Sequence, residues 1–180
     1  MVCPSHLTQA APTLTQCRNI QEFTAENKKL KPSRTFSNHS AVVNDVKFHP
    51  LIEKAIATVS DDCSLQVLDT NEPKDNRPAF KTENAHSDAI NSVSWNPQVE
   101  YLLATGSADK SIGIWDLRNL TEKVHSCDDH RDVVSQVEWH PTKRTILASS
   151  GYDRRVNFWD LNKCGEEMTP EDAEDGPSEL

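Results

Sequence analysis

Glycine, aromatic residues and long apolar stretches are scarce in this chain of 180 residues. Only 5 glycines occur, and they form no Gly-rich loop of the kind that cradles phosphates. No apolar run approaches the ~20 residues of a membrane-spanning helix, and residues 1–16 lack the charged and apolar regions of a secretory signal. We therefore expect neither a phosphate-binding loop nor a membrane-spanning or secreted protein.

Cysteine is also infrequent, and its spacing argues against a disulfide framework. The 5 cysteines are odd in number, widely spaced and without a Cys-x-x-Cys pair, which fits an intracellular chain with free thiols. His125, Cys127 and His130 lie close together, but structural zinc takes four ligands and His130 belongs to the repeat described below. We expect no metal and no other cofactor.

Negative charge is concentrated at the end of the chain. The formal net charge is -9, and residues 164–180 hold seven of the 28 acidic residues and no Lys or Arg. The remaining 21 acidic residues nearly balance the 19 basic ones. Because nucleic-acid phosphates require Lys and Arg, this distribution argues against direct nucleic-acid binding and favours a basic partner.

One pattern occurs three times, in copies that begin at His39, His86 and His130. In each copy an aromatic residue follows the histidine after 9 positions, Pro after 11, Thr or Ser after 19, and Asp after 23 and 30. The register holds without a gap, and only the spacers between copies differ in length. A fixed core with a period of 44 to 47 residues indicates a structural repeat, near the length of a four-stranded propeller blade.

Each copy predicts short β-strands and no helix. Segments such as "AINSVSWNP" and "VVSQVEWHP" alternate with period 2 and stop at Pro, whereas "AIATVS" and "LLATGS" are typical of buried strands. We expect an all-β chain of three four-stranded blades, over residues 39–85, 86–129 and 130–163. Residues 17–38 have the pattern of a remnant of a preceding blade. Residues 1–16 match no element that we can place, and we expect them to be disordered.

The Trp-Asp pairs at 115–116 and 159–160, with the spaced His and turn Asp, resemble WD-repeat proteins. That resemblance implies a β-propeller in which His, Asp, Ser or Thr and Trp form a hydrogen-bonded tetrad inside each blade. The implied sets are His86, Thr105, Asp109 and Trp115 in the second copy, and His130, Ser149, Asp153 and Trp159 in the third. The first copy has His39, Thr58 and Asp62, but Leu68 replaces Trp, so we expect this blade to be the weakest.

Ser149, His130 and Asp153 also have the composition of a hydrolase triad. The structural interpretation is the stronger one, because the same three roles recur in every copy and no G-x-S-x-G motif is present. We therefore expect a protein without catalytic activity.

The last segment, "GEEMTPEDAEDGPSEL", resembles a stretch that follows a late blade in one WD-repeat subfamily. Its members are the histone-binding proteins first named as retinoblastoma-binding proteins. They serve as small subunit of chromatin assembly factor, as accessory subunit of the type B histone acetyltransferase, and in deacetylase and Polycomb complexes. The resemblance covers residues from about 34 to 180 and implies binding of histones H3 and H4, with a location in the nucleus and also in the cytoplasm.

In that subfamily a helix of histone H4 docks against an acidic, Pro-containing loop and an N-terminal helix. The matching loop residues are Glu171, Asp172, Glu174, Asp175, Gly176, Pro177 and Leu180. The channel mouth of the propeller binds the H3 tail or a similar basic peptide, and the matching residues are Asn44, Asn91 and Ser135.

The subfamily has seven blades, so the resemblance implies an incomplete propeller and a partial product that lacks the N-terminal helix. An open arc exposes inner faces and sheet edges, which leads to the hypothesis that two copies pair into a six-bladed ring. Two other hypotheses stay open: a WD-repeat adaptor of another kind, such as a ubiquitin-ligase substrate receptor, and a propeller fragment without independent function.

Overall fold

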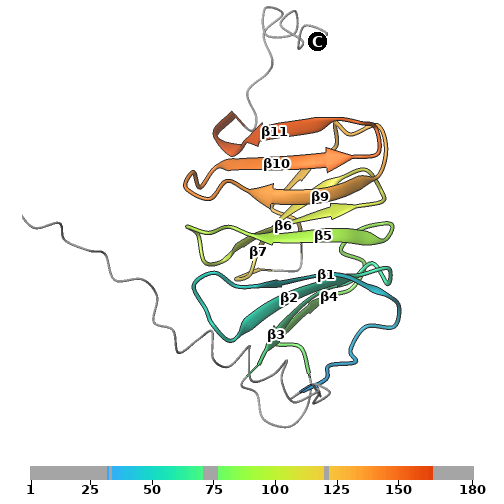
Figure 1. The fold of residues 1–180 in the computed structure, drawn as a ribbon, viewed down its shortest axis with the longest axis vertical. Coiled ribbons are helices and arrows are strands. Elements are labelled where there is room, and N and C mark those ends of the chain that lie inside the picture. Colours follow the sequence, from blue (N-terminus) through green and yellow to red (C-terminus); the bar gives the residue numbers. More distant parts are fainter. Residues whose placement is uncertain (1–31, 33, 71–76, 120–121, 164–180) are drawn as a thin grey trace, which may run out of the picture. The chain divides into compact units, whose positions relative to one another are not determined.

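Three antiparallel sheets follow one another along the chain in the computed structural model, which describes residues 32, 34–70, 77–119 and 122–163 (Figure 1). Blade 1 comprises β1 (Val43–Phe48), β2 (Ala55–Ser60), β3 (Leu65–Asp69) and β4 (Phe80–Thr82). Blade 2 comprises β5 (Ile90–Trp95), β6 (Leu102–Ser107), β7 (Ile112–Asp116) and β8 (His125–Cys127). Blade 3 comprises β9 (Val134–Trp139), β10 (Ile146–Gly151) and β11 (Val156–Asp160), followed by the 3-10 turn η1 (Leu161–Lys163).

The all-β prediction is confirmed for the described residues. Blades 1 and 2 have four strands each in sequential order, but blade 3 has three, in the order β11-β10-β9. The position of a fourth strand in blade 3 falls after η1, outside the described residues. Residues 1–16 and the acidic segment 164–180 lie outside the described residues, as does most of the expected remnant at 17–38.

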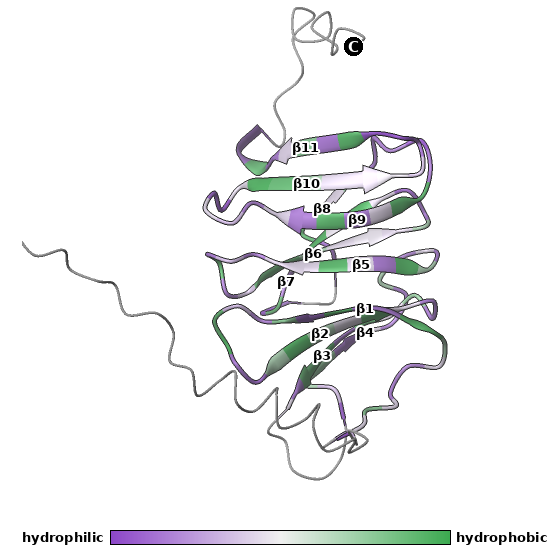
Figure 2. Ribbon diagram, in the orientation of Figure 1, coloured by the Kyte–Doolittle hydropathy of each residue, from purple (hydrophilic) through white to green (hydrophobic). Residues whose placement is uncertain are grey.

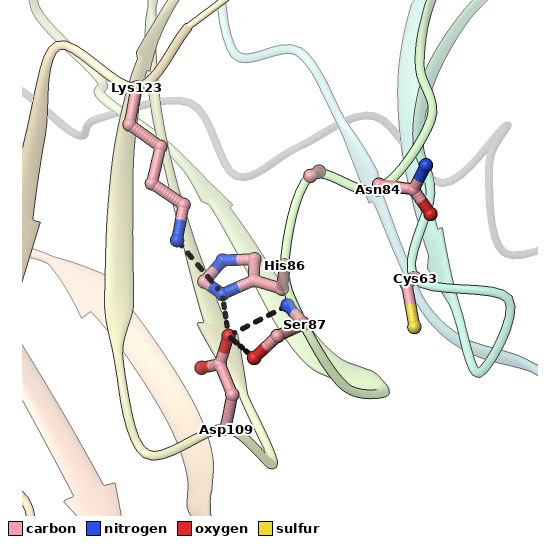
Figure 3. Close-up of a pocket in the computed structure, with 7 residues that line it drawn as sticks. Cys63, Asn84, His86, Ser87, Asp109 and Lys123 are labelled. Carbon is pink, nitrogen blue, oxygen red and sulfur yellow. Dashed lines mark hydrogen bonds and ion pairs between the residues drawn. The ribbon is translucent and has the colours of Figure 1, made fainter.

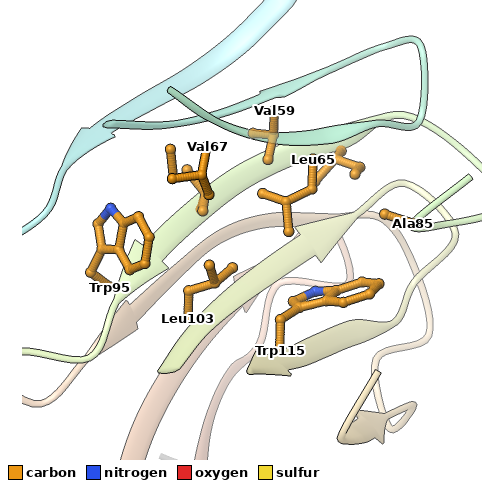
Figure 4. Packing of buried hydrophobic residues seen from close by; sticks show 10 residues of the cluster. Val59, Leu65, Val67, Ala85, Trp95, Leu103 and Trp115 are labelled. Atoms are coloured by element: carbon orange, nitrogen blue, oxygen red, sulfur yellow. The ribbon is translucent and has the colours of Figure 1, made fainter. Parts of the chain in front are cut away.

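The core lies between neighbouring blades rather than inside any one of them. Val59, Leu65 and Val67 of blade 1 form one buried cluster with Ile90, Val93, Trp95, Leu103 and Trp115 of blade 2 (Figure 4). Blade 2 contributes Ala104, Ile112 and Ile114 to a second cluster, together with Val134, Val137, Trp139 and Leu147 of blade 3. Each sheet is therefore apolar on both faces, and each face needs a neighbouring sheet to exclude water.

The innermost strands show how the repeat encodes this packing. Along β9, hydrophobic and hydrophilic residues alternate (Figure 2), and Val134, Val137 and Trp139 are buried while Gln136 and Glu138 are exposed. A register shift between Ser150 and Gly151 interrupts the pairing of β9 with β10. Blades 1 and 2 have a register shift at the matching place, between Val43 and Asp45 and between Ile90 and Ser92. The bulge lets positions 4, 7 and 9 after the histidine face the preceding blade.

Hydrogen bonds reinforce the contacts between blades at matching positions. His49 Nε2 lies 2.6 Å from the carbonyl oxygen of Glu100, and Asn96 Nδ2 donates to the carbonyl oxygen of Arg144 at 2.7 Å. His49 and Asn96 both stand 10 positions after the repeat histidine, and each bonds to position 14 of the next blade. His49 Nδ1 accepts the amides of Leu51 and Ile52, so the proton lies on Nε2 and Nε2 is the donor.

Gly106 marks the tightest approach of two blades, and replacing it should weaken their contact. A Cβ atom at Gly106 would lie 2.7 Å from Val134 Cγ1 and 3.0 Å from Val137 Cγ1. We therefore expect Gly106→Ala to lower the free energy of unfolding by about 1–3 kcal/mol, measured by urea denaturation. The matched control is Ser150→Ala at the same repeat position of blade 3, which removes one hydrogen bond, to Ser135 Oγ, and should cost no more than about 1 kcal/mol. Equal effects of the two substitutions would contradict the proposed contact.

Candidate functional site

The repeated polar residues meet inside the blades as hydrogen-bonded tetrads. In blade 2, His86 Nε2 lies 2.8 Å from Thr105 Oγ1, His86 Nδ1 lies 3.0 Å from Asp109 Oδ2, and Trp115 Nε1 donates to Thr105 Oγ1 at 2.8 Å. In blade 3 the corresponding distances are 2.7 Å (His130–Ser149), 2.9 Å (His130–Asp153) and 2.8 Å (Trp159–Ser149). The side chains of His86 and His130 have no solvent-exposed surface.

The hydrogen bonds of each tetrad run in one direction. Because the aspartate accepts from Nδ1–H, the neutral imidazole has its lone pair on Nε2 and accepts the hydroxyl proton, while the hydroxyl oxygen accepts the indole N–H. Burial of the imidazole, together with the ammonium group of Lys123, lowers the pKa of His86 to about 4. The neutral ring that this network requires is therefore stable at neutral pH.

The tetrad aspartate also fixes the tight turn between the second and third strands of each blade. Burial raises the pKa of the Asp109 carboxyl, but hydrogen bonds from Ser111 outweigh burial and hold the pKa well below its usual range. Asp109 Oδ1 accepts the backbone N–H of Ser111 at 3.0 Å, and Oδ2 accepts that of Ser87 at 3.0 Å. Lys110, which follows Asp109, has φ 74°, a left-handed conformation that these bonds must hold in place.

Blade 1 completes its network in a different way. Leu68 has no donor for Thr58, and His39 bonds to Thr58 Oγ1 at 2.9 Å and to Asp62 Oδ2 at 3.0 Å. The fully buried Gln66 adds donors beside this network, because its Nε2 donates to the carbonyl oxygen of Asn38 at 3.3 Å and to Ser64 Oγ at 3.4 Å, and it lies 3.2 Å from His39 Nδ1. Gln66 Oε1 has no hydrogen-bond partner, which leaves this blade with an unsatisfied buried acceptor.

Lys123 takes the same place in blade 2 that Gln66 takes in blade 1. Lys123 Nζ lies 3.2 Å from His86 Nδ1 and 3.4 Å from Ser111 Oγ, and burial lowers the pKa of its ammonium group. Gly113 occupies the strand position that corresponds to Gln66, and a Cβ there would lie 2.8 Å from Trp115 Nε1. The repeat pattern did not reveal Gln66 or Lys123; the only signal was a Gln in blade 1 at the position of Gly113.

A cleft of about 430 Å³ opens at the tetrad of blade 2. Figure 3 shows Lys123 and Asp109 reaching the same ring of His86, with Cys63 and Asn84 of blade 1 opposite them. Burial and nearby carboxylates raise the pKa of the Cys63 thiol, so Cys63 is not an activated nucleophile. The described residues contain no group of three or more His, Cys, Asp or Glu that could hold a metal ion.

The tetrads differ from a hydrolase site in the access to their hydroxyl groups. Ser149 is 3% exposed and its oxygen already accepts the indole N–H of Trp159. A nucleophilic serine must reach its substrate and keep a lone pair for attack. This arrangement supports the structural interpretation of Ser149, His130 and Asp153.

The three residues expected to contact a peptide lie at the beginnings of the innermost strands. Asn44 Nδ2 donates to the carbonyl oxygen of Ile90 at 2.9 Å, and Asn91 Nδ2 donates to that of Val134 at 2.8 Å. Both amides therefore connect one blade to the next. Ser135 Oγ donates to the carbonyl oxygen of Ser150 in its own blade at 3.0 Å. Contact of these residues with a peptide stays a prediction.

The acidic-segment residues, from Glu171 to Leu180, lie outside the part of the chain that the structure describes. Their role in binding therefore also stays a prediction. Among the described residues, no helix is long and apolar enough to cross a membrane.

Packed antiparallel sheets of three or four described strands, each with a His–Asp–Ser/Thr network, define the class of this protein: its sheets are blades of a β-propeller. The model of the family described as "WD domain, G-beta repeat" matches residues 30–69, 79–116 and 121–160. The chain belongs to this WD-repeat family.

Within this family, the chain is similar to several longer proteins that share one name. The chain is 67% identical over 162 residues to "Histone acetyltransferase type B subunit 2" of Aspergillus fumigatus, a match that covers 90% of this chain and 37% of that protein. Proteins of the same name match from Schizosaccharomyces pombe, at 62% identity over 89% of this chain and 37% of the relative, and from Mycosarcoma maydis, at 60% identity over 97% and 40%. The chain thus spans little more than a third of the length of these relatives.

Removing the indole donor from a complete tetrad should destabilise the chain. We expect Trp115→Phe and Trp159→Phe each to lower the free energy of unfolding by about 1–3 kcal/mol, because the tetrad hydroxyl loses the N–H that it accepts. The control is Leu68→Met in blade 1, which breaks no hydrogen bond and should cost less than about 1.5 kcal/mol. Urea denaturation followed by circular dichroism measures all three. A larger loss for Leu68→Met than for the Trp variants would refute this role of the indole.

The lowered pKa of His86 should make stability depend on pH. Below pH 6.5 the unfolded chain binds a proton at His86, while the folded chain stays neutral down to a pKa of about 4. The free energy of unfolding should therefore fall by about 3 kcal/mol as the pH drops from 6.5 to 4. Because Lys123 contributes to the shift, Lys123→Met should raise the pKa of His86.

An NMR titration of the His86 ring tests this prediction directly. Lys81→Met is the matched control, since Lys81 is a lysine near the tetrad of blade 1, where it pairs with Glu83 at 2.8 Å. It should leave the titration of His86 unchanged. A midpoint for His86 that is the same in the wild-type chain and in Lys123→Met would show that the ammonium group does not act on the ring.

Proposed function

We propose that this chain acts as a non-catalytic, histone-binding scaffold, in the manner of an accessory subunit of a histone acetyltransferase or a chromatin assembly complex. The observation that carries the proposal is the 67% identity to a protein named "Histone acetyltransferase type B subunit 2", extending over 90% of this chain. The buried tetrad hydroxyls support a scaffold rather than an enzyme.

The acidic segment 164–180 is the proposed contact for histones. It carries seven carboxylates and no basic side chain, and histone H4 would present Lys and Arg to it. Charges at the edge of an interface mainly set the association rate and the choice of partner. Glu171, Asp172, Glu174 and Asp175 would pair with the basic side chains, Gly176 and Pro177 would shape the turn, and Leu180 would add an apolar contact.

Histone H3 is the second proposed partner, at the ends of the innermost strands. Asn44 and Asn91 each use one amide N–H on a carbonyl oxygen of the neighbouring blade, and Asn44 uses its second on Asp61 Oδ1, so fewer donors remain for a peptide. The proposal for the H4 contact is therefore the stronger of the two. Association with acetyltransferase, deacetylase or chromatin assembly subunits, in the nucleus and also in the cytoplasm, belongs to the same proposal.

Neutralising the acidic segment should weaken histone binding. We expect the variant E171Q/D172N/E174Q/D175N to bind recombinant H3–H4 at least about tenfold more weakly than the wild-type chain, which corresponds to ~1.4 kcal/mol. Fluorescence anisotropy at two salt concentrations measures the change, and the salt dependence should also fall because fewer charges take part.

A charge-matched variant separates a local contact from general attraction. The variant E53Q/E122Q/D128N/D129N also removes four negative charges, but from exposed positions in blades 1 and 2. It should leave the affinity for H3–H4 within about twofold of the wild-type value. Equal weakening by both variants would mean unspecific electrostatic binding. Absence of binding by the wild-type chain would overturn the proposal for this chain and favour a WD-repeat adaptor with another partner.

A further inference from the structure

Lys123 reaches the tetrad of blade 2 from the spacer before β8, although a tetrad does not require a lysine. The tetrad of blade 3 has the same three hydrogen bonds, and no lysine of the described residues contacts it. In blade 1 the corresponding place beside the imidazole is taken by the amide of Gln66. The repeat therefore does not explain why a lysine lies at this point of blade 2.

The contact between Lys123 and His86 brings two hydrogen-bond donors together. Lys123 Nζ lies 3.2 Å from His86 Nδ1, the nitrogen whose N–H is donated to Asp109. An ammonium group has three donors and no acceptor, so it cannot accept this N–H. Once Lys123 loses a proton, the lone pair on Nζ can do so. The geometry at the tetrad thus favours the neutral amine over the ammonium group.

Lys123 also lacks the ion pair that normally keeps a lysine charged. Among the described residues, no carboxylate lies within 4.0 Å of its Nζ, and the hydroxyl of Ser111 at 3.4 Å is the acceptor. Lys81, near the tetrad of blade 1, shows the usual arrangement, because its Nζ pairs with Glu83 at 2.8 Å. The two lysines of the same chain therefore differ in what stabilises their charge.

The charges that act on the two lysines lead to the same difference. Asp109 and Asp128 attract the ammonium group of Lys123, but burial outweighs them and lowers its pKa below the ordinary value. The hydrogen bond with Glu83 raises the pKa of Lys81. At any pH near neutrality, a larger fraction of Lys123 is therefore the neutral, nucleophilic amine.

The cleft of blade 2 gives small molecules access to this amine. Lys123 is half-buried and lines the cleft of about 430 Å³. In Figure 3 its side chain extends toward His86, and Cys63 and Asn84 lie on the opposite side. A partly desolvated lysine that still opens to a cleft has the properties of a lysine that reacts with carbonyl groups.

We propose that Lys123 is an acylation site, whose ε-amine takes a short acyl group from an acyl thioester. The lone pair of Nζ attacks the carbonyl carbon of the thioester, so that a C–N bond forms and the C–S bond breaks. The thiolate leaves and takes up the proton that the amine loses. The product is an uncharged amide, and the surroundings of His86 lose one positive charge.

Acylation at Lys123 should change the protonation of the tetrad. Because the ammonium group helps to lower the pKa of His86, the amide should raise that pKa toward its ordinary value. A folded-state pKa closer to that of the unfolded chain reduces the stability lost on acidification. The acylated chain should therefore lose less stability than the unmodified chain as the pH falls from 6.5 to 4.

The first test measures how fast each lysine of the complete chain reacts with acetyl-coenzyme A. Peptide mass spectrometry gives the initial rate at each position over a series of pH values, and Lys81 is the internal control. At about pH 7.5 we expect Lys123 to react at least about threefold faster than Lys81. Its rate should also level off at a lower pH. A rate at Lys123 that does not exceed that of Lys81 would overturn the proposal.

The second test follows the His86 ring by NMR after the same treatment. The titration midpoint of His86 should rise in the wild-type chain and in Lys81→Arg. It should not change in Lys123→Arg, which keeps the positive charge but has no amine to acylate. An equal rise in treated Lys123→Arg would assign the effect to other lysines and contradict the proposal. Neither test depends on histone binding, which the charge variants of the acidic segment examine separately.

Discussion

Burial of the apolar faces of neighbouring blades is the constraint on which the rest of the structure depends. A four-stranded sheet with Ile90, Val93 and Trp95 on one face and Ile112 and Ile114 on the other cannot exclude water from both by itself. It must lie between two further sheets. The fixed register of the repeat follows, because a shift of one residue along any strand would turn its apolar side chains away from the adjacent blade.

The tetrads allow polar residues to lie inside this apolar packing. A buried hydroxyl, imidazole and carboxylate are costly unless every donor and acceptor finds a partner. In blades 2 and 3 the network is closed from indole to aspartate, and the aspartate additionally fixes the turn. These are the residue types of a hydrolase triad, but here the hydroxyl oxygen is bonded to Trp159 and shielded from solvent. Accessibility rather than composition decides between the two roles.

The strands and tetrad residues that recur in every copy could be predicted from the sequence, whereas residues peculiar to a single blade could not. Period-2 alternation located the strands, and spacing located His86, Asp109 and their equivalents, because these features recur in every copy. Gln66 and Lys123 could not be predicted. Gln66 lies on a strand and Lys123 lies in a spacer between two copies, and only the fold brings each of them to the same place beside the imidazole of its blade. Asn44 and Asn91 were predicted at the correct ends of the strands, but their amides also join adjacent blades. The acidic segment lies outside the described residues, so its prediction rests on charge and resemblance alone.

A repeat protein can be specific only where its copies differ. Positions such as Ile90 and Val134 recur in the repeat, and they hold one blade against another. The clearest difference is the set of seven carboxylates that follows blade 3. Its attraction for a basic partner is electrostatic and weakens with salt. The contacts between blades are apolar, and salting-out ions strengthen them. Salt therefore separates binding through the acidic segment from the packing that holds the blades together.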